Sequence, residues 1–313
     1  MSNRVIVVGS YNVDMTIVTD HLPAAGETVL GKELRYGHGG KGANQAVAAL
    51  RAGGEVALIG RVGDDAYGEQ AIADLHAEGL DVTGLKPLKG ENTGLASISI
   101  NAVGENSIIV ISGANAKLTA ADLDLETARI AAADTLLLQL ESPMDTVRRA
   151  AEIAREHHVR VILNPAPACQ LQADLLNLVS VITPNRVEAE MLTGIAIQNR
   201  DDMARAAHVF HDFGIPTVLI TLGDQGVYCS HPGGECHQAA LKVAARDTVG
   251  AGDVFNGFLA AQLQDEEQLP LALELAIAAS ALAVTRVGAQ SAIPNLEAVQ
   301  EFQRTRQPAE SVT

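Results

Sequence analysis

The strongest constraint on the fold is a regular alternation of short β-branched runs with helical patterns. Runs rich in Val, Ile, Leu and Thr have the length and composition of buried strands, and they occupy 4–9, 56–62, 135–140, 159–164, 179–183 and 217–221. Helical patterns lie between most of them, at 43–52, 66–78, 144–157, 186–193 and 202–213, and two more follow at 251–264 and 269–286. This order predicts an α/β fold of three αβα layers, with a mainly parallel sheet between helices.

Composition supports one large core rather than a disordered chain. Hydrophobic residues make up 47 % of the 313 residues and charged residues 19 %. The chain has no Trp and few Tyr or Phe, so Ala, Val, Leu and Ile must fill the interior. We therefore predict a single α/β domain over 1–313, since α/β enzymes often reach this length around one sheet.

Two regions, 12–38 and 93–113, interrupt the alternation. Both contain short, alternating segments punctuated by Gly, which is typical of antiparallel strands. We predict that they form a small β-sheet lid over the carboxyl edge of the main sheet, where open α/β sheets bind ligands. The alternative is a plain extension of the main sheet. Exposed lid strands leave unpaired edges, so a homodimer through the lid is expected.

Charge and cysteine content limit the partners and the compartment. Against 38 acidic residues stand 22 basic ones, a net charge of −16, which disfavours nucleic acids and anionic membranes. The N-terminus lacks a signal peptide pattern, and the apolar stretch 269–284 contains an acidic residue and is shorter than a membrane span of roughly 20 residues. The three cysteines are widely spaced and odd in number. These features predict a cytoplasmic protein.

The segment Asp247–Asp253, with the sequence Asp-Thr-Val-Gly-Ala-Gly-Asp, precedes a predicted helix. The Gly250-Ala251-Gly252 turn can present successive backbone amides at the helix N-terminus, which attracts anions. A carboxylate at Asp253 can accept a proton from a hydroxyl beside that anion site, as phosphoryl transfer requires. The alternative is an ordinary capped helix start.

A second segment, Gly37–Gln45, contains four glycines and Lys41 before an Ala-rich helix. Its glycines permit a close approach of the backbone to a ligand, and Asn44 can both donate to and accept from hydroxyl groups. The order of residues is not that of a Walker P-loop, and no dinucleotide-binding motif follows the first strand. The alternative is a Gly-rich turn without a ligand.

Together, and in this order, the two segments resemble the two signatures of the ribokinase/phosphofructokinase-B-type carbohydrate kinase family. The resemblance extends over essentially the whole chain. The run Gly39–Val47 and the segment Asn164-Pro-Ala-Pro-Ala168 look most similar to ribose-phosphorylating members. The resemblance implies an ATP-dependent and Mg²⁺-dependent kinase that phosphorylates the primary hydroxyl of D-ribose.

The resemblance also implies which residues hold the acceptor sugar. They are Asn12, Asp14, Gly40, Lys41, Asn44, Glu141 and Asp253. Asp14 is expected to bind hydroxyls through both carboxylate oxygens, and the alternative is a turn cap. Without the resemblance, Glu141 would be read as an acidic residue in the first turn of a helix. Asp253, Gly250, Ala251 and Gly252 are the expected catalytic residues.

On the nucleotide side, the resemblance implies residues from two strand ends and from the helix start. They are Asn185, Thr221, Gly223, Asp224, Gly226 and Gly252. Glu188 is expected to organise Mg²⁺ through water, because Mg²⁺ keeps several water ligands. Asn185 and Glu188 also have the spacing of a helix capping box, which is the alternative for this pair. The alternative for the loop after Thr221 is a simple β-turn.

A monovalent cation, K⁺, is implied beside the anion site. Its expected ligands are Asp247 and the backbone carbonyls of Val249, Ala283, Arg286 and Gly288. Ala292 stands where these kinases often have Ser, which leaves the need for K⁺ open. His38 replaces an apolar residue and leaves the sugar preference open, since it can either contact the sugar or pack against the lid.

Other functions fit the same motifs. Within the enzyme class, the acceptor could be deoxyribose, another pentose or ketose, or a nucleoside, although aromatic residues that would stack on a base are scarce. Outside it, a non-catalytic sugar or nucleotide sensor could keep the same pocket. Such a sensor would have no need of a base beside the anion site.

Overall fold

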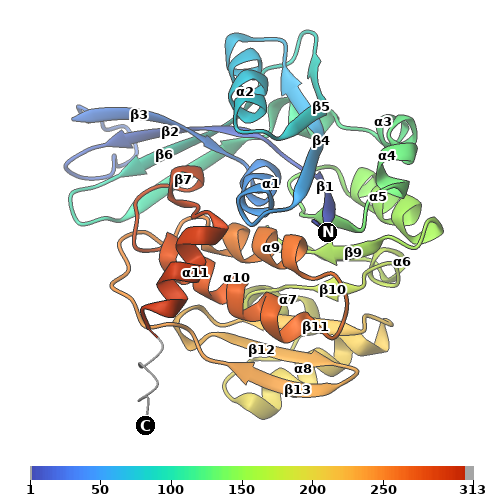
Figure 1. Ribbon diagram of the computed structural model, residues 1–313. Helices are drawn as coiled ribbons and strands as arrows, with labels where there is room; N and C mark the ends of the chain where they lie inside the picture. The colour runs from blue at the N-terminus through green and yellow to red at the C-terminus, as the bar shows by residue number, and fades with distance from the viewer. Residues whose placement is uncertain (1, 307–313) are drawn as a thin grey trace.

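The computed structural model describes residues 2–306 and has a mainly parallel sheet between two layers of helices (Figure 1). Within these residues the main sheet has nine strands in the order β13-β12-β11-β10-β9-β8-β1-β4-β5. The strands are β1 (Arg4–Val8), β4 (Glu55–Gly63), β5 (Asp81–Leu88), β8 (Thr135–Leu138), β9 (Arg160–Leu163), β10 (Val181–Ile182), β11 (Thr217–Thr221), β12 (Val227–His231) and β13 (Gly234–Gln238). Neighbouring strands pair in parallel except at β12, which pairs antiparallel with both β11 and β13. The predicted three-layer α/β fold is confirmed.

Alternate residues of the central strands face two separate hydrophobic cores. Val5 and Val7 of β1 contribute to one core, and Ile6 and Val8 contribute to the other. The first core includes residues of α1 (Lys41–Arg51), α2 (Ala66–Ala77), α9 (Ala251–Gln262), α10 (Leu269–Ala283) and α11 (Leu296–Arg304). The second includes residues of α3 (Ala120–Leu125), α4 (Thr127–Ala131), α5 (Met144–Glu156), α6 (Ala173–Leu176), α7 (Arg186–Thr193) and α8 (Arg200–Asp212). Helices thus cover both faces of the sheet.

Small residues allow α1 and α9 to pack closely. A Cβ added at Gly257 of α9 would lie 2.4 Å from the Cβ of Ala48 and 2.6 Å from the carbonyl oxygen of Gln45. Contacts this short exclude any side chain at position 257. Because Asp253 lies one turn before Gly257 in α9, this packing places it beside the start of α1.

The predicted lid regions form a separate four-stranded sheet in the order β3-β2-β6-β7. Its strands are β2 (Asn12–Val18), β3 (Glu33–Gly39), β6 (Gly94–Ile100) and β7 (Asn106–Ile111). The outer pairs are antiparallel as predicted, but the central pair, β2 and β6, is parallel. Strands β1 and β5 of the main sheet run in the same direction, and the chain continues from them into β2 and β6, so these two strands also share a direction. Figure 1 shows the small sheet projecting to one side of the main sheet.

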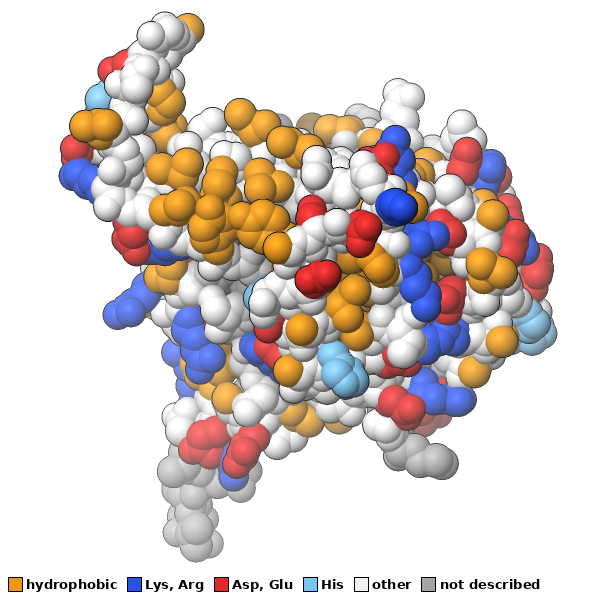
Figure 2. Space-filling model, turned by 90° about the horizontal axis from the view of Figure 1, so that it is seen from above, with side chains coloured by type: hydrophobic (Ala, Val, Ile, Leu, Met, Phe, Trp, Pro, Cys, Tyr) orange, Lys and Arg blue, Asp and Glu red, His pale blue; other side chains and the backbone are white. Residues whose placement is uncertain are grey.

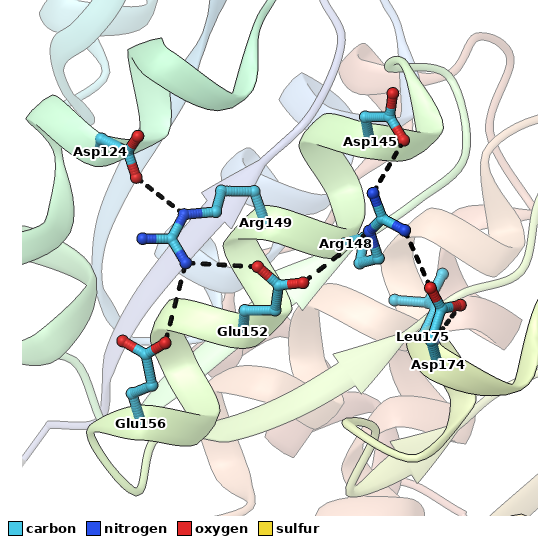
Figure 3. A network of polar contacts seen from close by, with 8 residues as sticks. All are labelled: Asp124, Asp145, Arg148, Arg149, Glu152, Glu156, Asp174 and Leu175. Carbon is cyan, nitrogen blue, oxygen red and sulfur yellow. Dashed lines mark hydrogen bonds and ion pairs between the residues drawn. The ribbon is translucent and has the colours of Figure 1, made fainter.

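On the surface, Arg148 and Arg149 join α5 to its neighbours (Figure 3). Arg149 pairs with Asp124 of α3 at 2.7 Å, and Arg148 pairs with Asp174 of α6 at 2.9 Å. These side chains are substantially exposed, so each pair adds little to stability. The network connects α5 with α3 and α6 at the surface.

No helix in 2–306 has both the length and the apolar character needed to cross a membrane.

Candidate active site

Asp253 and the start of α9 form the centre of the candidate site. The N-cap of α9 is Gly250, in the left-handed region at φ 77°, and no side chain caps this helix. Among the described residues, the backbone amides of Gly250, Gly252 and Asp253 have no hydrogen-bond acceptor. Such free amides at a helix N-terminus can bind a phosphate group.

The Asp253 side chain is directed away from its own helix and toward α1. Its carboxylate accepts hydrogen bonds from Asn44 Nδ2 at 3.1 Å and from Gln45 Nε2 at 2.9 Å. A capping role for Asp253 is therefore wrong. Asn44 is buried, and its Oδ1 has no partner in 2–306, so it can accept a hydrogen bond from a bound hydroxyl.

A network of buried amides supports this carboxylate. The Gln45 side chain also donates to Asn164 Oδ1 at 3.0 Å and accepts from Gln139 Nε2 at 2.7 Å. Asn256, one turn after Asp253, donates to the carbonyl of Gly252 at 2.8 Å. Residues of α1 and α9, and the residues that directly follow β8 and β9, thus support the position of Asp253. The roles of Gln45, Gln139 and Asn256 were not predicted, although two adjacent amide residues in an Ala-rich helix were a signal.

Asp14 lies in β2 of the small sheet, so a turn cap at this position is also wrong. Its carboxylate has no hydrogen-bond partner within 2–306. A Cβ added at Gly39 of β3 would lie 2.1 Å from Asp14 Oδ1, so the absence of a side chain at Gly39 leaves the space that this carboxylate occupies. Asn12, on the same face of β2, is buried, and its Oδ1 accepts from Asn115 Nδ2 at 2.9 Å.

Glu141 connects the end of β8 with the Gly-rich segment. One of its oxygens, Oε2, accepts hydrogen bonds from Ser10 Oγ at 2.6 Å and from the backbone amide of Lys41 at 2.9 Å. Gly40 adopts φ 84°, and a Cβ there would lie 2.7 Å from the backbone nitrogen of Asn12. The Gly-rich segment, β2 and Glu141 therefore meet in one place.

The pKa shifts show that these groups belong to one site. Burial, together with the charges of Glu141 and Asp253, raises the pKa of Asp14 to about 6. Burial also raises the pKa of Asp253, while Lys41 and the amides of Gln45 and Asn44 lower it. Charges that perturb one another in this way are close in space, and such clusters are frequent at functional sites.

Glu188, in the first turn of α7, interacts electrostatically with Asp253 and Lys41. Burial raises its pKa, the amide of Asn185 and the charge of Lys41 lower it, and Asp253 raises it again. The capping box of α7 is present: Glu188 Oε2 accepts from the Asn185 amide at 2.8 Å, and Asn185 Oδ1 accepts from the Glu188 amide at 2.9 Å. Within 2–306, the other oxygen of Glu188 has no donor and can accept a hydrogen bond.

The other residues expected at the nucleotide follow β10 and β11. Asn185 and Thr221 form an isolated parallel bridge, which places these two strand ends side by side. Gly223 and Gly226 have φ 60° and 98° and enclose a short 3₁₀ turn at Gly223–Gln225. This geometry is compatible with both interpretations of the loop, namely a simple β-turn and a loop that faces the nucleotide.

Asp247 joins two of the segments expected to bind a monovalent cation. Its Oδ1 accepts from the Val249 amide at 3.0 Å and its Oδ2 from the Gly288 amide at 2.9 Å. The Ala283 carbonyl accepts from the Arg286 amide at 2.9 Å. The carbonyls of Val249, Arg286 and Gly288 have no hydrogen-bond donor within 2–306.

His38 does not face the acceptor side of the small sheet. In the β2–β3 pairing it lies opposite Val13, whereas Asn12 and Asp14 lie opposite Gly39 and Gly37. Because side chains alternate along a strand, His38 is on the face opposite Asn12 and Asp14. Of the two roles left open for His38, packing beside the small sheet is the one that this register supports.

Comparison with known proteins gives a consistent result. The family model described as pfkB family carbohydrate kinase matches residues 2–296. The ribokinase of Haemophilus influenzae is 43 % identical over 302 residues, which cover 96 % of this chain and 99 % of that protein. The deoxyribokinase of Salmonella typhi is 34 % identical, with 95 % and 98 % covered. The structure of Arabidopsis thaliana ribokinase complexed with ribose and ATP has a TM-score of 0.90 at 29 % identity, with 96 % and 99 % covered.

Proposed function

The chain belongs to the pfkB family of carbohydrate kinases, and on that basis we propose that it transfers the γ-phosphoryl group of ATP to the primary hydroxyl of D-ribose, giving ribose 5-phosphate. The observation that carries this proposal is Asp253, a buried carboxylate beside the free amides at the start of α9. A base next to an anion site is the arrangement that phosphoryl transfer to a hydroxyl requires. The similarity to a ribokinase at 43 % identity supports ribose as the acceptor.

The proposed roles of the residues are as follows. Asn12, Asp14, Gly40, Asn44 and Glu141 hold the sugar between the small sheet and the start of α1. Asp253 accepts the proton of the primary hydroxyl while the hydroxyl oxygen attacks the γ-phosphorus of ATP. The free amides of Gly250, Gly252 and Asp253 stabilise the charge on the phosphoryl oxygens.

The nucleotide lies along the carboxyl edge of the main sheet in this proposal. Asn185, Thr221, Gly223, Asp224 and Gly226 contact ATP there. Lys41 has no ion-pair partner in the described part of the chain, so its ammonium is available to the transferred phosphoryl group.

Mg²⁺ fits the charge and the donors of this site. Four carboxylates, Asp14, Glu141, Glu188 and Asp253, share the site with Lys41, so ATP would meet an excess of negative charge. Glu188 keeps one free carboxylate oxygen, and Mg²⁺ bound by water to a carboxylate and to phosphate oxygens is its usual protein environment. When bound, the ion would offset the charge of the phosphates. Glu188 would hold it through water.

K⁺ also fits, as an activator next to the anion site. Asp247 and the carbonyls of Val249, Ala283, Arg286 and Gly288 would hold it, and three of these carbonyls lack a donor in 2–306. Hydrogen bonds from the backbone amides of Val249 and Gly288 to Asp247 bring these two segments together without any ion. Such a site would add positive charge near the Gly250–Gly252 amides.

We further propose that the small sheet is a lid and that two copies of the chain associate through it in the cytoplasm. Every residue of β7 is exposed, including Ile108, Ile109, Val110 and Ile111, and β7 is an edge strand. Figure 2 shows hydrophobic side chains gathered at the left, where the small sheet projects. An exposed apolar edge strand is a liability in a monomer, and a second copy would cover it. Sedimentation velocity of the free protein tests this state.

An ADP-release screen tests the proposed activity. We expect ribose to give the highest kcat/KM among pentoses, hexoses and nucleosides, and K⁺ to raise the rate. Both oxygens of Asp14 are free to accept from two hydroxyls, and a lost hydrogen bond to a charged group costs about 1.5–3 kcal/mol. We therefore expect 2-deoxyribose to be at least about tenfold poorer than ribose. A preference for deoxyribose would favour the deoxyribokinase alternative, and no ADP release with any sugar would favour a sensor.

The pH dependence of sugar binding provides a separate prediction. The pKa of Asp14 is about 6, and only the ionised carboxylate can accept two hydroxyl protons. One pH unit below the pKa, about a tenth of Asp14 is ionised, so we expect the ribose Kd at pH 5 to be about tenfold higher than at pH 7.5. Calorimetry without ATP measures this change. A Kd that is the same at both pH values would contradict the role of Asp14.

A further inference from the structure

Tyr11, His38 and Asp74 form a chain of polar contacts where the small sheet joins the main domain. The Tyr11 hydroxyl lies 2.7 Å from His38 Nδ1, and His38 Nε2 lies 3.2 Å from Asp74 Oδ2. The three residues come from the link between β1 and β2, from the end of β3, and from α2. The other oxygen of Asp74 accepts from Gln70 Nε2 of the same helix at 2.7 Å, so both carboxylate oxygens are held.

The neighbouring groups indicate which atoms of Tyr11 and His38 carry a proton. Burial raises the pKa of Tyr11, with smaller contributions from the charges of Asp74 and Asp14, so the phenol keeps its proton at neutral pH. His38 Nε2 lies beside the Asp74 carboxylate, so we place the imidazole proton on Nε2, and Nδ1 then accepts from the Tyr11 hydroxyl. We assign this tautomer from the hydrogen-bond partners.

Tyr11 is directly connected to the residues that would hold the sugar. Its backbone amide donates to Asn115 Oδ1 at 3.0 Å, and its carbonyl accepts from Asn115 Nδ2 at 2.8 Å. The same amide group of Asn115 donates to Asn12 Oδ1. A Cβ at Gly40 would lie 2.8 Å from Tyr11 Cα, so Tyr11 also contacts the Gly-rich segment. The main chain of Tyr11 is fixed by Asn115, and its side chain is fixed by His38.

We propose that His38 is a positioning residue for the acceptor sugar. Through Tyr11 it fixes the segment that carries Asn12 and Asp14, and through Asp74 it ties the base of the small sheet to α2. His38 itself does not reach the sugar, because it lies on the opposite face of the small sheet. This inference rests on the proposed sugar kinase function.

A second contact between the same elements supports the tie to α2. The ring centroids of Tyr36 on β3 and Tyr67 on α2 are 6.1 Å apart. Tyr36 and His38 lie on the same face of the small sheet. Tyr67 lies two turns before Asp74 in α2. Helix α2 therefore contacts β3 at two places, but only the His38 contact continues through Tyr11 to the sugar-binding segment.

The test compares variants of the full chain that remove single contacts. Tyr11→Phe removes only the hydroxyl, and His38→Phe places at this position an apolar residue of the kind expected from the family. We expect each to raise the ribose KM about fivefold, as the loss of one hydrogen bond would. The ATP KM and kcat should stay within about twofold. His38→Gln keeps a side chain that can donate and accept, and should recover part of the ribose KM.

Two controls separate positioning from general stability. His208→Gln removes an exposed His–Asp pair on α8, where the side chains are 76 % and 69 % exposed, and should leave all three constants unchanged. The double variant Tyr11→Phe/His38→Phe should resemble the single variants, because both remove the same contact. Melting temperatures are recorded for every variant.

Three results would overturn the inference. They are an unchanged ribose KM in Tyr11→Phe, additive effects in the double variant, or equal changes in the ribose and ATP KM values. If the wild-type chain releases no ADP with ribose, the proposed function fails first and this inference fails with it. Wild-type turnover in the same assay distinguishes the two cases.

Discussion

Replacing Asp253 by Asn should reduce turnover at least about 10²-fold while ribose binding stays nearly unchanged. The carboxylate is the base that accepts the hydroxyl proton, and removing a general base typically costs 10²–10⁴-fold. An amide at position 253 can still accept the hydrogen bond from Gln45 Nε2. Asn44 can turn its own amide, since its Oδ1 has no partner in 2–306, so the fold should tolerate the change.

Single-turnover kinetics and calorimetry test this prediction together. Asp212→Asn, a change at an exposed carboxylate of α8, is the matched control and should retain wild-type turnover. Near-normal turnover in Asp253→Asn would remove Asp253 from the chemistry. A variant that neither turns over nor binds ribose would point to a structural role for the carboxylate instead.

The sequence was sufficient to predict the layers of the fold because strand and helix periodicities differ clearly. It did not predict β5, where Gly84 and Pro87 interrupt the strand pattern. The hairpin of β12 and β13 was also missed, since residues 234–238 are largely exposed and carry few apolar residues. The parallel pairing of β2 with β6 depends on where the chain leaves the main sheet, and no local pattern contains that information.

The site was predicted where a residue type has a distinctive chemistry. The motif around Asp253 and the Gly-rich segment indicated the base, the anion site and the sugar side. The supporting amides of Gln45, Gln139 and Asn164 were not recognised, because a buried amide has no signature apart from its partners. The roles of Asp14 and Glu188 became clearer only when the structure showed which carboxylate oxygens are already engaged.

Two glycines in the small sheet allow a sharper test of the proposed sugar-binding residue Asp14. Gly39 and Gly37 lie two residues apart on β3, and neither has a positive φ. A Cβ at Gly39 would lie 2.1–2.5 Å from the carboxylate atoms of Asp14, whereas a Cβ at Gly37 would have no neighbour within 4 Å. Gly37 is also exposed and Gly39 buried, but only a Cβ at Gly39 would meet Asp14, so the pair of Ala variants tests the placement of Asp14.

We expect Gly39→Ala to raise the ribose KM about 10- to 100-fold and Gly37→Ala to leave it within about twofold. The added methyl group must push the Asp14 carboxylate away from the sugar, and each charged hydrogen bond lost costs about 1.5–3 kcal/mol. Asp14 is a flexible side chain rather than backbone, so the Gly39→Ala protein should still fold, and its ATP KM should not change. Steady-state kinetics with both substrates measure these effects. Equal ribose KM values in the two variants would show that Asp14 does not bind the acceptor, and the sugar would then have to be placed elsewhere along the Gly-rich segment.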